Sequence, residues 1–286
     1  AALLELKSVS DWINEGSSKP EFNTSALDKV DPAGPQTILL LGADKRWGGV
    51  GAGDPPRSDT MMLVHLDADQ GISVLSIPRD LKVRIPGTRG YNKINAAMAI
   101  GGPALAIKTV KQLFGPQLKI SHAVTVNFRG FRHAVDKVGC IYIDVDRHYF
   151  NDNSPPYGGG PKYAVIDVKA GYQRLCGQQA LDYVRYRHFD NDIVRSARQQ
   201  HFLTDAKNQI GTSDIWNKRQ QLIRLFGRYT DTDIHDGTTI LRLLKLVVGA
   251  SSQPVRRIEF PADIGTSYVT VTPQHLEQTL GEFLSA

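Results

Sequence analysis

The sequence predicts an α/β fold: an α/β/α layered single domain with a central mixed sheet flanked by helices. Short apolar runs of strand length alternate along the chain with longer stretches of helical character, which is typical of layered α/β domains. The 286 residues are enough for one large core, and no second core follows the first. The hydrophobic share of 41% and the charged share of 22% are those of an ordinary soluble globular protein.

The predicted strands are apolar runs that end at glycine, proline or polar turns. The run Thr37–Leu41 is almost entirely apolar and stops at Gly42, so it predicts a buried strand. Two further runs flank the turn Ala68–Gly71 and predict a strand pair. In chain order, the expected strands are Thr37–Leu41, Met61–Asp67, Ile72–Ile77, Ala123–Asn127, Ile141–Val145, Tyr163–Asp167, Val255–Phe260 and Tyr268–Val271.

Helices are predicted between these strands and at both ends of the chain. Residues 1–36 are expected to form a short helix, Leu3–Asn14, and a polar linker, and residues 37–286 form the main domain. Gly101–Pro103 predicts a break in the first long helix, and a proline in its first turn favours the closing one. The other expected helices are Asn95–Leu113, Phe128–Val138, Gly177–Arg187, Ile193–Ile210, Trp216–Tyr229, Thr239–Ala250 and Pro273–Leu284.

Two aspartates are candidate ligands of a magnesium ion. Asp44 follows the strand Thr37–Leu41 by three residues, at the carboxyl mouth where open α/β sheets bind ligands. Asp59 lies just before the next strand, so both carboxylates are expected over one edge of the sheet. Mg²⁺, or Mn²⁺ in its place, takes one or two carboxylates and leaves positions for phosphate oxygens. The alternative is that each aspartate only hydrogen bonds the backbone of its own turn.

A dense set of arginines accompanies these carboxylates. Arginine grips phosphate oxygens with a planar fork, so arginines beside a magnesium site favour a pyrophosphate ligand. Arg195 and Arg198 are three residues apart on a predicted helix and share a face. The pair Arg185 and Arg187 can converge only if their helix ends near Tyr186. The arginines in question are Arg57, Arg79, Arg185, Arg187, Arg195 and Arg198.

For each of the following polar residues, a simple structural role is the alternative to a role in the site. For Arg79, in the run S-I-P-R-D, it is a surface salt bridge with Asp80. Asp192 lies near a predicted helix N-terminus, so it is either a functional carboxylate or a simple cap. Gln199 and Gln200 either donate to a phosphate or sugar or are only solvated.

The two cysteines, Cys140 and Cys176, permit one disulfide, with two buried free thiols as the alternative. The disulfide would be worth about 4 kcal/mol in the chain-entropy model. It would also place the protein outside the cytosol.

Composition and motifs exclude several other classes. A net charge of +5 suggests an anionic partner, yet no zinc-finger spacing, lysine run or aromatic-basic signature is present, so we expect no nucleic acid partner. The glycine-rich stretch Gly48–Gly53 lacks the pattern of a P-loop and is interpreted as a mobile lid. The eight histidines include no i, i+4 pair, which argues against a zinc hydrolase. No apolar run is long enough to span a membrane, and the chain starts without Met, so we expect any membrane anchor to lie outside this sequence.

Several motifs in fixed order resemble the LytR–CpsA–Psr family of cell-wall glycopolymer phosphotransferases. The resemblance covers residues 37–203, with a weaker echo at residues 255–270. The motifs are L-L-L-G-A-D-K-R, R-S-D-T-M-M, S-I-P-R-D, K-I-N-A-A, F-R-G-F-R-H-A-V-D-K-V-G, A-L-D-Y-V-R-Y-R and D-N-D-I-V-R-S-A-R-Q-Q.

The resemblance implies a membrane-anchored extracytoplasmic domain, at the cell membrane or wall. Such a domain would bind a polyprenyl diphosphate-linked glycopolymer and transfer the phospho-glycan to a hydroxyl of peptidoglycan. By the same resemblance, Asp44 and Asp59 are the magnesium aspartates. The implied diphosphate contacts are Arg57, Arg79, Arg185, Arg187, Arg195, Arg198 and Gln199.

The resemblance also implies an apolar tunnel for the lipid between sheet and helices. Ordinary core packing is the alternative for its candidate walls, which are Phe128, Phe131, Val135, Leu181, Val184 and Phe202.

Two departures from the family pattern are informative. Ile193 and Val194 stand where many members have Phe-Gly, so the entry into that helix is expected to differ. Cys140 stands where a second glycine is common, and Cys176 just before Gly177, which strengthens the disulfide prediction. This pair resembles the actinobacterial branch, in which the transferred polymer is often arabinogalactan.

The expected mechanism is an in-line attack of a sugar hydroxyl on the phosphorus attached to the glycan. Arg79, Arg195 and Arg198 are the candidate catalytic arginines, and Asp192 is the candidate general base. Two other functions remain open: a lipid-diphosphate carrier or anchoring protein without turnover, and a lipid pyrophosphatase with water as the acceptor.

Overall fold

A six-stranded mixed sheet forms the middle of the structure, a computed structural model that describes residues 11, 23–43, 58–154, 165–186, 192–250 and 252–285. The strand order is β11-β6-β1-β2-β3-β12, with β6 parallel to β1 and β12 parallel to β3. The other pairings in this sheet are antiparallel. The strands are β1 (Gln36–Ala43), β2 (Ser58–Asp67), β3 (Gly71–Ile77), β6 (His122–Asn127), β11 (Thr230–Thr232) and β12 (Val255–Ile258).

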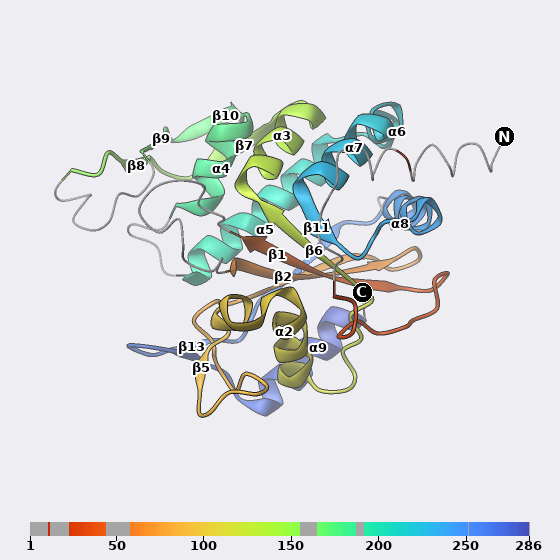
Figure 1. Cartoon of the computed structure of the whole chain (residues 1–286). Coiled ribbons are helices and arrows are strands. Elements are labelled where there is room, and N and C mark those ends of the chain that lie inside the picture. Colours follow the sequence, from red (N-terminus) through yellow and green to blue (C-terminus); the bar gives the residue numbers. More distant parts are fainter. Residues whose placement is uncertain are drawn as a thin grey trace.

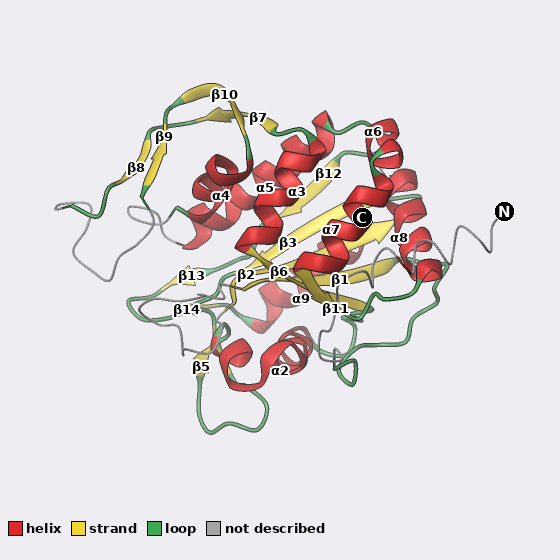
Figure 2. Ribbon diagram, turned by 45° about the horizontal axis from the view of Figure 1, so that its top comes forward, coloured by secondary structure: helices red, strands yellow, loops and turns green. Residues whose placement is uncertain are grey.

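Helices cover both faces of this sheet. Figures 1 and 2 show α2 and α9 on one face and α3, α4, α5 and α7 on the other. Helix α8 packs against β2 and β3. The helices are α2 (Ala96–Phe114), α3 (Phe128–Val138), α4 (Gly177–Arg185), α5 (Asp192–Gln209), α6 (Thr212–Asn217), α7 (Arg219–Tyr229), α8 (Gly237–Ala250) and α9 (Pro273–Leu284). None of the helices in the described ranges combines the length and apolar character needed to cross a membrane.

The sequence of β1 shows why the sheet is covered twice. Alternate side chains of a strand point to opposite faces. Leu39 and Leu41 pack into the core cluster that contains α2 and α9, whereas Ile38 and Leu40 pack against the cluster that contains Ile223 of α7. A strand buried on both faces must be apolar at nearly every position, as this one is.

Four two-stranded sheets extend the domain. Two of them, β7–β10 and β8–β9, contribute to a core cluster with α3, α4 and α5. The strands are β4 (Lys82–Val83), β5 (Asn92–Lys93), β7 (Ile141–Val145), β8 (Tyr149–Asn151), β9 (Ile166–Val168), β10 (Gly171–Leu175), β13 (Asp263–Ile264) and β14 (Val269–Thr270).

The predicted fold class, layers and mixed sheet are confirmed. The predicted break in the first long helix is also present, since Gly101 and Gly102 have non-helical backbone angles inside α2. The single helix predicted for Trp216–Tyr229 is wrong at its start. The structure ends α6 at Asn217 and begins α7 at Arg219, with Lys218 as the junction between the two.

Candidate active site

The candidate site lies at one edge of the six-stranded sheet. β1 and β6 run in parallel, and their last residues, Ala43 and Asn127, are paired. β2 runs the opposite way, so its first residue Ser58 pairs with Ala43, and β3 ends at the same edge with Ile77. β12 is parallel to β3 and ends there as well, so the edge gathers the carboxyl ends of four strands, which is where open α/β sheets bind ligands.

Asp59 and Arg79 form an ion pair at this edge. Arg79 Nη1 donates to Asp59 Oδ1 at 2.6 Å, and Arg195 Nη2 donates to the Asp59 carbonyl oxygen at 2.6 Å. The Asp59 side chain is 36% exposed and that of Arg79 is 16% exposed, so the carboxylate is the more accessible partner. Arg79 Nε lies 3.9 Å from Asp80 Oδ2. The salt bridge with Asp80, which is the alternative role for Arg79, is therefore longer than the contact with Asp59.

The oxygen chemistry at Asp59 suits a divalent cation. Arg79 binds Oδ1, and within the described residues Oδ2 accepts no hydrogen bond, so it is left as a hard oxygen ligand. Asp44 directly follows Ala43, and Arg57 directly precedes Ser58, but both lie outside the described residues. Asp59 thus fits the expected metal site, and the role of Asp44 stays a prediction.

Helix α5 turns a polar face towards the sheet edge and the end of α4. Arg195 and Arg198 are 2% and 5% exposed, so the face that their spacing predicts is buried. Gln199 Nε2 donates to Thr60 Oγ1 at 3.0 Å and to the Val184 carbonyl oxygen at 3.1 Å. These bonds fix α5 against the first residues of β2 and the last turn of α4.

Arg198 holds the carboxyl end of α4. Its Nη1 donates to the carbonyl oxygens of Tyr183 at 3.1 Å and Tyr186 at 3.0 Å, and its Cζ lies 4.4 Å from the centroid of the Tyr149 ring. A cation is favourable at this end of a helix because the last carbonyl groups carry partial negative charge. These contacts give Arg198 a structural task, and its contact with a diphosphate stays a prediction.

Arg185 is the last residue of α4. Its Nη2 lies 3.1 Å from Asp182 Oδ1, and its Cζ lies 5.4 Å from the centroid of the Phe128 ring. Burial raises the pKa of the Asp182 carboxyl. The backbone of Tyr186 is not helical, with ψ 138°, so α4 ends before this residue. An end near Tyr186 is the condition under which the side chains of Arg185 and Arg187 can converge. Arg187 itself lies outside the described residues.

Asp192, the candidate base, is the first residue of α5. Its side chain is not among the described ones. The placement at a helix N-terminus is the one that a capping role requires. The role of Asp192 as a base stays a prediction.

Four of the six candidate walls of the lipid tunnel pack in one cluster. Val135, Val184 and Phe202 are buried in one cluster, and Phe131 packs against it with its ring centroid 5.6 Å from that of Phe202. Leu181 is 4% exposed. Their contacts are those of a core, and a lining role toward lipid stays a prediction.

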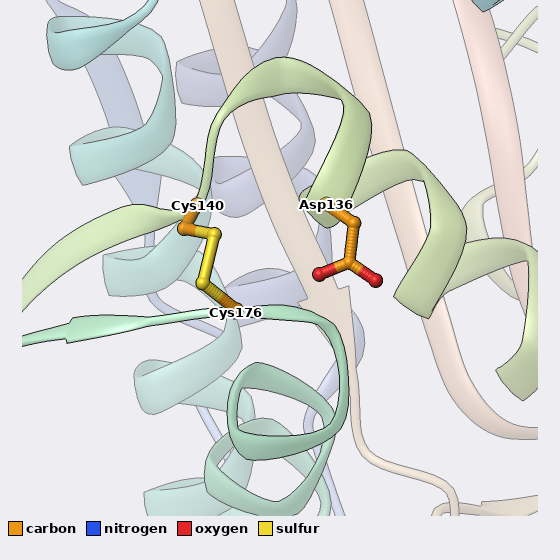
Figure 3. Close-up of side chains that lie close together, drawn as sticks. All are labelled: Asp136, Cys140 and Cys176. Atoms are coloured by element: carbon orange, nitrogen blue, oxygen red, sulfur yellow. A yellow bond between two sulfur atoms is a disulfide. The ribbon is translucent and has the colours of Figure 1, made fainter.

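The predicted disulfide between Cys140 and Cys176 is present and joins the end of α3 to the start of α4. Figure 3 shows Asp136 beside it, with its carboxylate near the first turn of α4. Asp136 Oδ1 accepts a hydrogen bond from the Gly177 backbone N–H at 2.7 Å. These three side chains are close enough to form a metal site, but the disulfide removes both thiolates that such a site needs.

Sequence reasoning missed several residues that shape the site. Gln200 was interpreted as a phosphate, sugar or solvent contact, yet its Nε2 donates to Ser76 Oγ at 3.1 Å and to the Ile258 carbonyl oxygen at 3.4 Å. Thr60 and Asp182 were also missed as partners of site residues. The only available signal was their place inside the motifs R-S-D-T and A-L-D-Y-V-R.

Comparison with known proteins gives a consistent family. The model of the LytR_cpsA_psr family matches residues 4–283. Polyisoprenyl-teichoic acid–peptidoglycan teichoic acid transferase TagU of Oceanobacillus iheyensis is 33% identical over 222 residues, which cover 74% of this chain and 63% of that protein. The corresponding transferase TagT of Bacillus subtilis is 30% identical over 205 residues, covering 71% of this chain and 62% of that one. The chain therefore spans less than two thirds of the length of these relatives.

A solved structure has the same fold. The crystal structure of B. subtilis TagV aligns with a TM-score of 0.67 at 27% identity, covering 88% of this chain and 98% of that chain.

Proposed function

The chain belongs to the LytR–CpsA–Psr family, and from this premise we propose that it transfers a glycopolymer phosphate from a polyprenyl diphosphate carrier to peptidoglycan. The observation that carries the proposal is the meeting of Asp59, Arg79 and Arg195 at the carboxyl edge of the sheet. The names of the relatives TagU and TagT support the same class of reaction.

The reaction needs position and charge more than covalent chemistry. A hydroxyl oxygen of the acceptor attacks the phosphorus that carries the glycan. A new P–O bond forms, and the bond from that phosphorus to the bridging oxygen breaks. Polyprenyl phosphate leaves with the electron pair, and the hydroxyl proton passes to a base, for which Asp192 is the candidate.

In this proposal Arg79 binds the diphosphate. Its guanidinium is fixed by Asp59 and remains partly exposed, so it meets an anion with little loss of side-chain freedom. Arg195 donates to the Asp59 carbonyl oxygen and so orients the Asp59 backbone. Asp59, with Asp44, would hold a Mg²⁺ ion, and such an ion would neutralise charge on the phosphate oxygens.

We propose an extracytoplasmic location, supported by the disulfide Cys140–Cys176, because such bonds persist in oxidising compartments. The same pair, in its resemblance to the actinobacterial branch, makes an arabinogalactan precursor the first donor to try. A teichoic acid precursor is the second, because TagU and TagT are named for that polymer.

The test is turnover of a short polyprenyl diphosphate-sugar with Mg²⁺, with and without a peptidoglycan fragment. We expect wild type to release polyprenyl phosphate and leave the sugar phosphate on the fragment. Arg79→Ala should lower the rate by about 100-fold or more. Arg242→Ala, an exposed arginine of α8, is the matched control and should retain the wild-type rate.

Two outcomes would contradict the proposal. Free sugar phosphate, formed equally well without the fragment, would indicate a lipid pyrophosphatase. Tight binding of the lipid without product, under every acceptor tried, would indicate a carrier.

A further inference from the structure

A basic and aromatic surface lies directly beyond Arg79. The hairpin formed by β4, β5 and their connecting loop follows Arg79 after two residues. Two turn glycines, Gly87 and Gly90, have φ of 79° and 74°, and Thr88 N–H closes the turn on the Ile85 carbonyl oxygen at 3.1 Å. The loop therefore has a defined shape.

The hairpin is fastened to the rest of the domain. Val83 and Ile85 are 6% and 2% exposed and belong to the core cluster beneath the sheet. Leu81 bridges Val269 of β14, and the Val269 N–H donates to the Asp80 carbonyl oxygen at 3.0 Å. This contact brings Tyr268 next to the hairpin, and Figures 1 and 2 show β5 and β13 on the same part of the molecule.

The outer side of the hairpin carries stacked cations and rings. Tyr91 is 53% exposed, and both the Lys82 Nζ and the Arg84 Cζ lie 4.9 Å from the centroid of its ring. The same Lys82 Nζ lies 5.7 Å from the centroid of the Tyr268 ring. Cation–π contact of this kind holds the long basic side chains in place over the rings.

The positive charge of this surface is not balanced locally. Among the described residues, no carboxylate lies within 4.0 Å of the side-chain nitrogens of Lys82, Arg84 or Arg89. Lys93 differs, since its Nζ lies 3.0 Å from Asp80 Oδ1. The surface is therefore complementary to an anionic ligand.

We infer that this surface, formed by Lys82, Arg84, Tyr91 and Tyr268, binds the acceptor as a glycan strand that carries carboxylates. The electron-rich face of a tyrosine ring attracts the C–H bonds of a sugar ring, and the cations bind carboxylate oxygens. The position also fits, because Lys82 is three residues from Arg79, which is at most about 10 Å of chain, and the turn closed by Leu81 N–H on the Pro78 carbonyl oxygen at 3.1 Å keeps the two closer still.

A bilayer fits this surface less well than a glycan. Tyr91 is the only large apolar side chain that is strongly exposed on the described hairpin, Lys82–Lys93. Near Tyr268, Ile264 of β13 is also 60% exposed. Insertion into lipid needs a broader apolar face than one ring and one aliphatic side chain.

This inference rests on the proposed function, but its test does not require turnover. Wild type and the double variant Lys82→Glu/Arg84→Glu are sedimented with insoluble peptidoglycan at low salt. We expect the variant to bind at least about tenfold more weakly. Tyr91→Ala should also weaken binding. Wild type and the double variant should bind equally poorly to peptidoglycan whose carboxylates have been amidated.

The control is Trp216→Ala/Arg219→Glu. Arg219 Cζ lies 4.6 Å from the Trp216 ring at the junction of α6 and α7, so the control removes the same kind of cation–ring pair elsewhere on the molecule. It should bind peptidoglycan as wild type does. Unchanged thermal unfolding of all variants establishes that the surface alone was altered.

Kinetics separate this inference from the proposed function. If transfer occurs, the double variant should raise KM for the peptidoglycan fragment and leave kcat and donor binding unchanged. If no transfer occurs but peptidoglycan binding depends on Lys82 and Arg84, the inference that this surface binds peptidoglycan is supported and the proposed function is wrong. Equal binding by wild type and the double variant, equal loss in the control, or loss of binding only to anionic phospholipid vesicles would overturn the inference.

Discussion

At the scale of single residues, Arg79 and Arg198 bind different kinds of partner although both belong to the candidate site. Arg79 pairs with an accessible carboxylate, whereas Arg198 is 5% exposed and donates to two backbone carbonyl groups at the end of α4. Truncation of Arg198 would leave those carbonyls without their charged donor. A loss of activity in Arg198→Ala therefore reports on the fold as well as on the site.

We expect Arg198→Ala to lower the free energy of unfolding by about 1–3 kcal/mol, the cost of buried acceptors that lose a donor. Urea denaturation of the variant and of wild type measures this difference. Arg242→Ala, on the exposed side of α8, is the control and should change stability by less than about 0.5 kcal/mol. An Arg198→Ala protein as stable as wild type would contradict the structural role.

The buried carboxyl of Asp182 predicts how the stability of the protein depends on pH. Burial raises the pKa of its carboxyl in the folded protein above the ordinary value of 3.8, against the hydrogen bond from Gln178 Nε2 at 2.9 Å and the charge of Arg185. Ionisation of this carboxyl therefore opposes folding. Wild type should lose stability relative to Asp182→Asn as the pH rises above 3.8 and passes the raised pKa.

Denaturation of both proteins at a series of pH values, from below 3.8 to neutral, measures this difference. Gln178→Ala removes a hydrogen bond that favours the ionised carboxyl, so in that background the loss should extend to higher pH. A stability difference that moves in the opposite direction with pH would mean that burial does not dominate at Asp182.

The residue types of the site could be predicted from the sequence, but their partners could not. Asp59 is expected at this edge and Arg79 is expected as a diphosphate contact, and the structure brings them together. Their contact depends on the antiparallel pairing of β2 with β3, and that register is not written in either motif. The internal bonds of Gln199 likewise depend on how α5 docks against Thr60 and α4.

At the scale of elements, the start of α4 depends on the close approach of Asp136 to Gly177. A side-chain carbon at position 177 would lie 2.5 Å from Asp136 Oδ2, so Gly177→Ala must displace the carboxylate that accepts the Gly177 N–H. We expect Gly177→Ala and Asp136→Ala each to cost about 0.5–2 kcal/mol, the usual cost of a lost helix cap.

The double variant tests whether both substitutions break the same contact. If they do, it should be about as stable as either single variant, because the contact can be lost only once. Thermal or urea unfolding of all four proteins gives the coupling free energy. Additive costs would show that Asp136 and Gly177 act independently.

Long amphipathic or apolar elements were predictable, and short ones were not. The predicted bounds of α3, β7 and α9 match the structure, because each has a clear period and a clear end signal. The hairpin strands β4 and β5 have two residues each, which is too short for any period to show. The sequence around β10 is polar and exposed, and it forms a strand only because β7 pairs with it.

At the scale of the whole molecule, the sheet order brings distant segments to one edge. The class of fold follows from alternating elements, but the placement of β12 beside β3 joins residues about 180 positions apart and has no local signal. The same order separates two surfaces. The Asp59 edge is proposed to bind the donor, and the hairpin beyond Arg79 is proposed to bind the acceptor.

This separation predicts selective stabilisation by a donor analogue. A short prenyl diphosphate with Mg²⁺ that binds only the folded state should add about 2.7 kcal/mol to the free energy of unfolding at a hundredfold excess over Kd. For a chain of this size that is about 4–5 °C in Tm. Wild type and Lys82→Glu/Arg84→Glu should both show the full shift in a thermal scan, because the hairpin is not needed for the donor. Asp59→Asn should lose most of it, and a chelator should remove it from every protein, since the carboxylate and the cation act together. A full shift in Asp59→Asn would place the diphosphate elsewhere, and a shift lost in the hairpin variant would mean that donor and acceptor share one surface.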